Sequence, residues 1–226
     1  MKNIMTNLNE LKSMYVEKLG DKVSEQFSPF FVRVGENFDG KSGVLFVGKA
    51  DNQAGYHKSI ELAFSHIQHD YIEDIAEKCK PYSGSAYVRT LHRIAKELKK
   101  KGITCFARTN LYKLSNTQSH KFGSEYDAAN FDIFRKEIEM LQPKYVILFT
   151  SGMECPFLDI IGKGRDIVQS VKFNYRNKGK QQHKELKCIK IKGCDSIFIT
   201  ALHPQGKPES DMVKQIIGLI DKAESK

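Results

Sequence analysis

Tyr145-Val-Ile-Leu-Phe149 is a continuous apolar run, and it decides the fold together with three runs like it. The other three are Val44-Leu-Phe-Val47, Ile103-Thr-Cys-Phe-Ala107 and Ser196-Ile-Phe-Ile-Thr200. Strands without polar alternation are expected to be covered on both faces, which is typical of parallel sheets. Helical patterns lie between the runs, and this alternation favours helices on both sides of the sheet. The sequence therefore predicts a three-layer α/β/α domain with a central, mainly parallel sheet of four strands.

The clearest helix is expected over residues 85–101, where apolar side chains keep a helical period and Gly102 ends the pattern. The three lysines at its end favour the negative end of the helix dipole. Further helices are expected near residues 5–19, 58–78, 128–141, 153–161 and 209–223.

The 226 residues are expected to form one domain, because no repeat, low-complexity block or long linker divides them. Residues 1–42 are interpreted as an N-terminal helical extension. With 40% hydrophobic and 28% charged residues, the composition excludes a disordered or collagen-like chain. No apolar run reaches the length of a membrane span, and residues 1–10 lack the apolar core of a signal peptide, so we expect a cytoplasmic protein.

Basic residues outnumber acidic residues by 36 to 27, and the surplus is concentrated in one segment. Between Lys172 and Lys192 there are eight basic residues and one acid, so this segment carries seven of the nine net positive charges. Its pattern predicts two antiparallel strands, residues 168–175 and 185–192, joined by the turn Asn177-Lys-Gly-Lys180. We interpret residues 166–193 as an inserted basic hairpin. It suits a polyanion or an anionic membrane surface, and the alternative is a solvated hairpin that only aids solubility.

Polar segments follow the four apolar runs. They are Gly48-Lys-Ala-Asp-Asn-Gln-Ala-Gly55, Arg108-Thr-Asn-Leu-Tyr-Lys113, Thr150-Ser-Gly152 and Ala201-Leu-His-Pro-Gln-Gly206. Ligands of open parallel sheets bind beyond the carboxyl ends of the strands, so we expect one cleft at this edge. It would hold a carboxylate, two carboxamides and an imidazole, from Asp51, Asn52, Asn110 and His203. Each also has a structural explanation, as a helix cap, a turn residue or a surface histidine.

Other well-known sites are not matched. A phosphate-binding P-loop needs Gly-Lys-Ser or Gly-Lys-Thr, and Gly55-Tyr-His-Lys-Ser59 breaks that pattern. His66, His69 and Asp70 could share a helix face and hold a metal, but the Glu of the His-Glu-x-x-His motif and a clear third ligand are missing. The five cysteines are widely spaced, without Cys-x-x-Cys, and indicate neither a disulfide framework nor a metal centre. Neither a metal nor a cofactor is expected.

Taken in order, the polar loops resemble those of the uracil-DNA glycosylase superfamily. Proteins of this family carry a Gly-rich loop after the first core strand, an Asn after the second and His-Pro-Ser-Pro after the last. Gly48-Lys-Ala-Asp-Asn52, Thr109-Asn-Leu-Tyr-Lys113 and His203-Pro204 stand in these places, and the resemblance spans roughly residues 43–220. It implies a uracil-DNA-glycosylase-like fold and hydrolysis of the N-glycosidic bond of uracil or another deaminated base in DNA, in base excision repair.

The resemblance also implies a role for individual residues. In this family an Asn amide bonds the pyrimidine edge of a flipped-out base, an aromatic ring stacks on the base, and a His stabilises the negative charge that grows on its carbonyl. Asn110 and His203 would take the first and last of these roles, and Tyr56 or Phe64 the second. The residues implied in base binding are Gly48, Lys49, Tyr56, Phe64 and Asn110.

Catalysis is implied for Asp51, Asn52 and His203. A carboxylate in the first loop would orient the attacking water and stabilise the oxocarbenium-like sugar. One branch of the family has this carboxylate where Ala50 stands here, so Asp51 is displaced by one residue. If Asp51 points away from the sugar, water activation passes to Asn52 or Glu61, or is absent.

The DNA backbone is expected to lie along the hairpin and the last polar loop. The residues expected to contact it are Lys178, Lys180, Lys184 and Lys207, with Phe173 and Tyr175 interleaved. Lys207 replaces the apolar residue that family members wedge into duplex DNA, which favours single-stranded DNA as the partner. Two alternatives stay open: a catalytically decayed module that binds nucleic acid without cutting it, and a nucleotide-binding protein.

Overall fold

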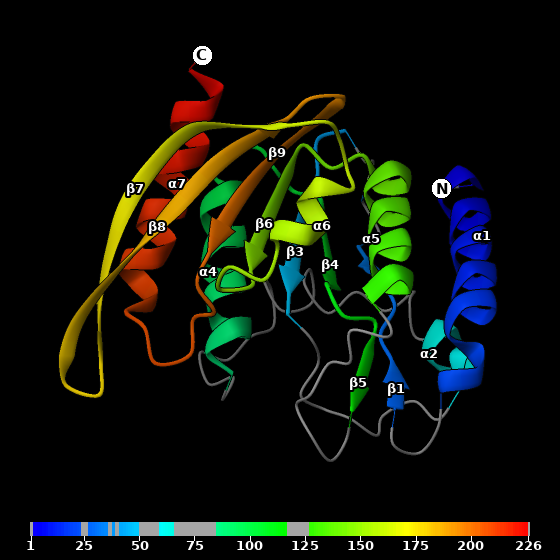
Figure 1. Cartoon of the computed structure of the whole chain (residues 1–226). Coiled ribbons are helices and arrows are strands. Elements are labelled where there is room, and N and C mark those ends of the chain that lie inside the picture. Colours follow the sequence, from blue (N-terminus) through cyan, green and yellow to red (C-terminus); the bar gives the residue numbers. More distant parts are fainter. Residues whose placement is uncertain are drawn as a thin grey trace.

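The computed structural model describes residues 2–23, 27–35, 38, 41–49, 59–65, 85–116 and 127–225. It has a mixed α/β fold around a seven-stranded sheet (Figure 1). In spatial order the strands are β2 (Arg33–Val34), β4 (Phe106–Asn110), β3 (Val44–Gly48), β6 (Tyr145–Phe149), β9 (Cys194–Ala201), β8 (Lys180–Ile191) and β7 (Arg165–Asn177).

Each of the four predicted apolar runs contributes a strand to this sheet. Neighbouring pairs are parallel from β4 through β3 and β6 to β9, with Val44 opposite both Phe106 and Tyr145. The pairs β2–β4, β8–β9 and β7–β8 are antiparallel. The prediction of a four-stranded sheet is therefore incomplete, because strands on both sides continue its hydrogen bonding into a mixed sheet of seven.

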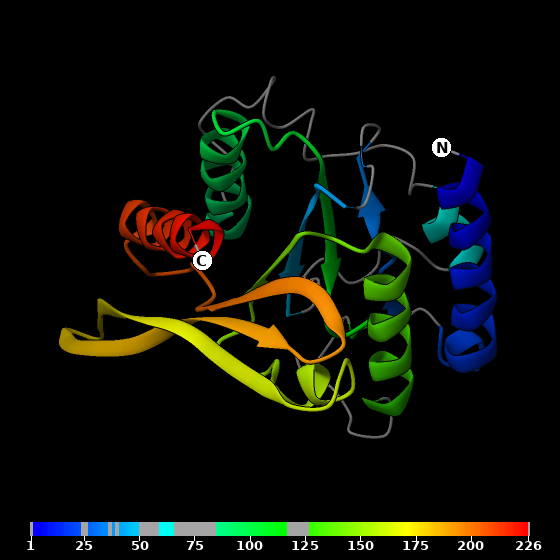
Figure 2. The same ribbon diagram turned by 90° about the horizontal axis from the view of Figure 1, so that it is seen from above.

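Helices pack against both faces of the sheet (Figure 2). On one face lie α1 (Lys2–Leu19), α5 (Asp127–Leu141) and the short α6 (Cys155–Asp159). On the other face lie α4 (Ala86–Lys99) and α7 (Glu209–Glu224). Alternate residues of β3 face opposite ways, so Leu45 joins the first apolar cluster and Phe46 the second. The helix predicted over 85–101 is confirmed, with Ser85 as its N-cap.

The N-terminal segment is more than a helical extension. After α1 and a 3-10 turn (Gly20–Lys22), β1 (Phe27–Pro29) pairs with β5 (Leu114–Asn116) in a separate two-stranded sheet. β2 then joins the edge of the main sheet beside β4. Tyr15 of α1 stacks on Phe31 with ring centroids 3.8 Å apart, so this segment is packed into the domain. α2 (Ile60–Ser65) contacts α1.

The predicted hairpin forms from β7 and β8, and it is longer than expected. Pairing runs from Arg165 opposite Ile191 to Asn177 opposite Lys180. The two turn residues, Lys178 and Gly179, both have positive φ (50° and 77°), as a tight two-residue hairpin turn requires. β8 is also hydrogen bonded to β9, so the hairpin extends the main sheet. Its tip curves toward the edge at which the parallel strands end (Figure 1). Among the described residues, no helix is both long and apolar enough to span a membrane.

Candidate functional site

The carboxyl ends of the four parallel strands meet at one edge of the sheet. Gly48 lies opposite Asn110, and Phe149 lies opposite Ala201. Two backbone hydrogen bonds continue past the strand ends, from Leu111 N to the Gly48 carbonyl (2.9 Å) and from Ser151 N to the Ala201 carbonyl (3.2 Å). Because these ends are in register, Lys49, Asn110 and His203 are brought to the same edge.

The absence of a side chain at Gly48 leaves the space that the Asn110 amide occupies. A Cβ added at Gly48 would lie 2.4 Å from Asn110 Oδ1 and 3.3 Å from the hydroxyl of Tyr87. Any side chain at this position would displace the Asn110 amide, so only glycine permits the observed packing. Asn110 is 5% exposed and is the last residue of β4. The sequence interpretation placed it in a loop after the strand, because the strand begins three residues later than predicted.

Tyr87 of α4 packs against His203, and its hydroxyl approaches Gly48 as the Asn110 amide does. Its ring stacks on His203 with centroids 5.9 Å apart and an interplanar angle of 13°, and it meets Phe149 edge-on at 5.7 Å. The helical period of residues 85–101 assigned Tyr87 to the buried face of a helix. That pattern does not separate it from the ordinary core, so the sequence interpretation missed its contact with the site.

His203 is held by its own loop in an orientation that defines its hydrogen bonding. Its backbone N–H donates to Ser151 Oγ (2.9 Å), and its Nδ1 accepts from the backbone N–H of Gln205 (3.3 Å). A neutral imidazole that accepts at Nδ1 carries its proton at Nε2. Ser151 itself has a φ of 58°, in the left-handed region that is uncommon for residues other than glycine.

Burial and two neighbouring cations favour the neutral form of this imidazole. The pKa of His203 is lowered from its ordinary value, first by burial and then by the positive charges of Lys207 and Lys49. His203 is therefore a neutral hydrogen-bond donor at pH 7, beside two ammonium groups. Such an arrangement suits a ligand that carries or develops negative charge.

A buried ion pair lies directly behind Asn110. The ammonium of Lys113 lies 2.6 Å from Glu137 Oε2, and both side chains are fully buried. The same ammonium donates to Thr109 Oγ1 (2.8 Å) and to the main-chain carbonyl of Asn110. Glu137 also accepts from the Thr109 hydroxyl (2.9 Å) and from Tyr15 (3.4 Å). All three ammonium protons thus have acceptors, as a buried charge requires.

Burial opposes the charge on both members of this pair. It lowers the pKa of Lys113 and raises the pKa of Glu137, while the attraction between them acts in the opposite direction. The sequence interpretation quoted Lys113 only as the end of a polar loop and did not identify Glu137. Glu137 falls on the buried face of α5 with Ile133 and Ile138, and a carboxylate among apolar helix positions is a signal that could have marked the pair.

The first polar loop is described only in part. Lys49 is half-buried, whereas Asp51, Asn52 and Tyr56 lie outside the described residues. Phe64 packs edge-on against Phe31 at 5.7 Å on the α1 face of the sheet. Phe64 is therefore not brought beside Asn110 and His203, and the aromatic ring that the structure brings to them is Tyr87.

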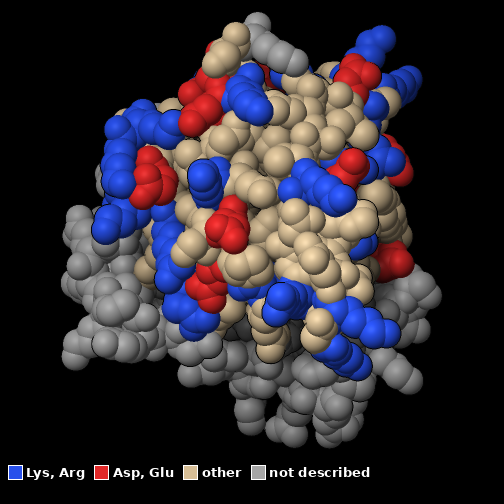
Figure 3. Space-filling view, turned by 90° about the vertical axis from the view of Figure 1, so that its left-hand side faces the viewer, with Lys and Arg blue, Asp and Glu red and all other residues tan. Residues whose placement is uncertain are grey.

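The basic hairpin reaches the loop of His203 through one contact. The ammonium of Lys207 lies 5.0 Å from the ring centroid of Tyr175 on β7. Lys178 and Lys184 are exposed on the hairpin, and Figure 3 shows Lys and Arg side chains gathered along the lower part of this side of the molecule. Phe173 is fully buried against α7, so the expectation that it interleaves with the lysines at a DNA backbone is wrong.

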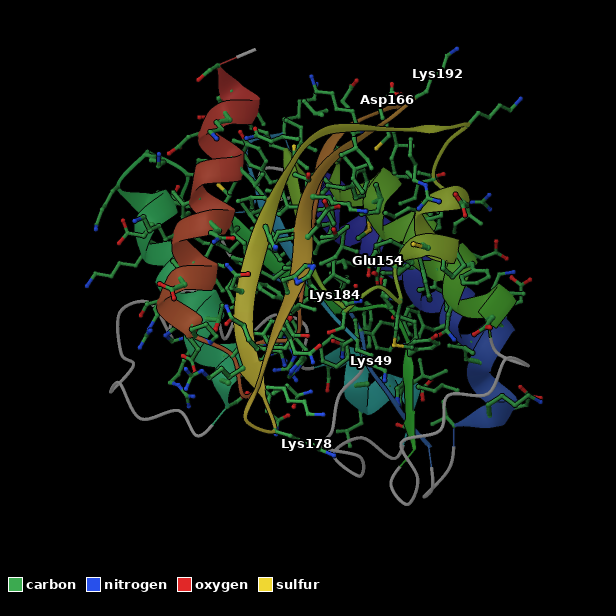
Figure 4. All side chains as sticks on the ribbon, turned by 60° about the vertical axis from the view of Figure 1, so that its left-hand side comes forward. Lys49, Glu154, Asp166, Lys178, Lys184 and Lys192 are labelled. Atoms are coloured by element: carbon green, nitrogen blue, oxygen red, sulfur yellow. The ribbon has the colours of Figure 1, made fainter. Side chains whose placement is uncertain are left out.

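Lys180 is exposed next to the turn, and Lys192 lies at the other end of the hairpin from Lys178 (Figure 4). In the described part of the chain, no group of three or more His, Cys, Asp or Glu side chains could hold a metal ion. His66, His69 and Asp70 lie outside the described residues. No protein-family model and no curated protein sequence matches this chain.

Proposed function

We propose that this chain is a DNA glycosylase-like protein that hydrolyses the N-glycosidic bond of uracil or another deaminated base in DNA. One observation carries the proposal: the amide of Asn110 and the neutral imidazole of His203 lie at one sheet edge, where the ring of Tyr87 stacks on the imidazole. The parallel order of the four core strands also supports the uracil-DNA-glycosylase-like fold that the loop motifs resemble. The partner would be single-stranded DNA in the cytoplasm.

The chemistry assigns a distinct task to each side chain. The amide of Asn110 can pair with the donor and acceptor groups on the edge of a flipped-out base. When the bond between C1′ and the base nitrogen breaks, its electron pair moves onto the base and its carbonyl oxygens. The Nε2–H of His203 would donate a hydrogen bond to one of these carbonyl oxygens and stabilise its negative charge without transferring the proton. Water, oriented by Asp51 or Asn52, then forms a bond to C1′, and the proton that it loses neutralises the released base anion.

The two ammonium groups near His203 fit the same step. Lys49 and Lys207 lie close enough to lower its pKa, so their field also favours an anionic base. Their charges are already in place before the bond breaks, which is the condition for effective electrostatic stabilisation. The exposed lysines Lys178, Lys180 and Lys184 would hold phosphates at the hairpin.

Excision is tested directly with oligonucleotides that contain uracil, hypoxanthine or xanthine, as single strands and as duplexes, and with alkali to cleave the abasic product. Wild-type protein should release at least one of these bases, and His203→Asn should lower the rate about 10²-fold or more, as loss of an oxyanion donor does elsewhere. His183→Asn is the matched control, because His183 is exposed on β8. Absence of cleavage by stoichiometric protein on every substrate rejects the enzyme.

A second function, binding without hydrolysis, is favoured by the two cations beside His203. A pair of ammonium groups can hold a phosphate as readily as it stabilises an anionic base. In that case DNA binding would depend on salt and survive Asp51→Ala and Asn52→Ala, with no product formed. Charge reversal of Lys178, Lys180 and Lys184 then separates DNA from a free nucleotide, because only DNA reaches the hairpin.

A further inference from the structure

A groove with a volume of about 620 Å³ lies between the hairpin and the loop that follows β6. Its walls include Leu158 of α6, Ile167 and Lys184 of the hairpin, and Ser151 and Leu202 at the sheet edge. Figure 4 shows Lys184 on the hairpin and Glu154 across from it, with Lys49 of the first polar loop below. The groove is separate from the Asn110 amide and takes one wall from the inserted hairpin.

The hairpin wall of the groove carries one unusually exposed apolar side chain among charged ones. Ile167 is 57% exposed, more than the other large apolar side chains that are exposed in the described part of the chain, Val16 (48%) and Leu62 (44%). Ile189 lies opposite Ile167 in the hairpin register and also lines the groove. An exposed isoleucine at the wall of a groove is the kind of surface that a ligand covers.

The groove also presents one cation that is free to bind an anion. Arg165 pairs with Asp159 (2.9 Å) and Lys187 with Glu185 (3.5 Å), whereas Lys184 has no ion pair within the described residues. The carboxylate of Glu154 is occupied, because it accepts from the Thr150 hydroxyl and from the Gly152 N–H (3.0 Å). An exposed isoleucine beside a free ammonium suits a nucleotide, which has an apolar base face and a phosphate.

The groove reaches two residues that hold the loop of His203. Ser151, which lines the groove, accepts the backbone N–H of His203 at 2.9 Å, and Leu202 immediately precedes that histidine. A nucleotide next to the one at His203 would therefore enter the groove. In a duplex the base faces are stacked and unavailable to an apolar wall, whereas a single strand exposes them.

We propose that this groove seats a nucleotide that flanks the target in single-stranded DNA, with its base against Ile167 and its phosphate at Lys184. The inference rests on the proposed function, because it takes the target base to lie at His203 and places the neighbouring nucleotide of the DNA strand from there. The groove contact would not depend on the identity of the target base or of its neighbours. It would favour single-stranded DNA over duplex DNA.

Binding of fluorescein-labelled dT12 and of a dT12·dA12 duplex, followed by fluorescence anisotropy at fixed salt, tests the groove. Ile167→Asp and Lys184→Glu should each weaken binding of dT12 by about tenfold or more, the loss typical of one stacking or phosphate contact. Val16→Asp and Lys192→Glu are the matched controls. They introduce the same charges at an exposed apolar residue of α1 and at the far end of the hairpin, and should weaken binding less than about threefold.

The outcomes separate the groove from the proposed function. Equal losses in test and control variants mean that net charge alone determines binding, and overturn the groove. So does wild-type protein that does not bind dT12, or that binds the duplex as tightly as the single strand. If the test variants lose binding selectively but no base is excised from any oligonucleotide, the groove stands and the enzyme is rejected. Thermal unfolding of each variant verifies that the fold is intact.

Discussion

The ammonium group of Lys113 donates to the main-chain carbonyl of Asn110, the residue whose side chain lies across Gly48 at the sheet edge. This bond connects the backbone of the proposed base-binding residue to an ion pair that is wholly inside the protein. The same network reaches α1 through Tyr15 and α5 through Glu137. The position of Asn110 is therefore fixed from behind by the packing of two helices.

The buried pair should be costly to break from one side. Lys113→Met leaves the Glu137 carboxylate buried without its cation, and we expect the free energy of unfolding to fall by about 3–5 kcal/mol. The double variant Lys113→Met with Glu137→Leu removes both charges and should be more stable than the single variant. Urea denaturation of the two variants measures the difference. A double variant that is less stable than Lys113→Met would contradict this account of the pair.

The neutral state of His203 predicts a specific pH dependence. Its folded pKa is lowered, so the stability it contributes is complete above the unfolded value of about 6.5 and is lost as the pH falls through the lower folded value. Excision should decline over the same acid range, because protonation at Nδ1 ends the hydrogen bond from Gln205. An NMR titration of the imidazole gives the pKa directly.

The cause of that shift can be tested in the same titration. Lys207→Met removes a positive charge near the ring, so the pKa of His203 should rise toward its ordinary value. Lys163→Met, a change of the same size at an exposed residue, is the control and should leave the titration unaltered. A pKa that falls or stays constant in Lys207→Met would show that the charge does not act on the ring.

Gly48→Ala should disturb Asn110 in particular. The new Cβ would lie 2.4 Å from Asn110 Oδ1, and we expect a loss of about 1–3 kcal/mol in stability, as in other overpacked sites. Asn110→Ala in the same chain removes the clashing atom and should recover part of the loss. Gly218→Ala on α7 meets no atom within 4 Å and should instead stabilise the helix by about 0.5–1 kcal/mol. Thermal and urea unfolding compare the three variants.

The two aromatic residues of β7 should respond differently to truncation. Phe173 is fully buried, so Phe173→Ala is expected to cost about 3–5 kcal/mol of stability. Tyr175 is half-buried beneath Lys207, so Tyr175→Ala should cost less stability and weaken DNA binding through the loop of His203. Urea denaturation and anisotropy with dT12 separate the effects. Equal losses of stability would contradict the different environments of the two rings.

The strands were predictable because apolar runs report burial on both faces, but the limits of one run were not. Ile103 lies beyond the end of α4 and caps it, because its N–H donates to the Leu98 carbonyl (3.1 Å), and β4 starts only at Phe106. An apolar residue that covers a helix end looks the same in sequence as one that begins a strand. As a result, Asn110 falls inside the strand.

The features of the site that could not be predicted from the sequence depend on contacts between distant segments. The Tyr87–His203 stack and the Lys113–Glu137 pair join residues that no local pattern relates. The turn of the hairpin was predicted because Lys178 and Gly179 lie in a local sequence signal. The pairing of β8 with β9 depends instead on which edge of the sheet is free.

The pairing of β8 with β9 determines how far the hairpin reaches from the main sheet. β8 lies between β7 and β9, so its pairing with β9, from Lys187 opposite Thr200 to Ile191 opposite Cys194, anchors the base of the hairpin to the strand that ends before His203. Beyond Lys187 the hairpin continues as a ribbon of β7 and β8 alone, paired as far as Asn177 opposite Lys180, and the length of this ribbon sets how far the tip reaches from β9. In the proposed function, the length of this ribbon limits the interval along the DNA between a phosphate held at the tip and the base at His203.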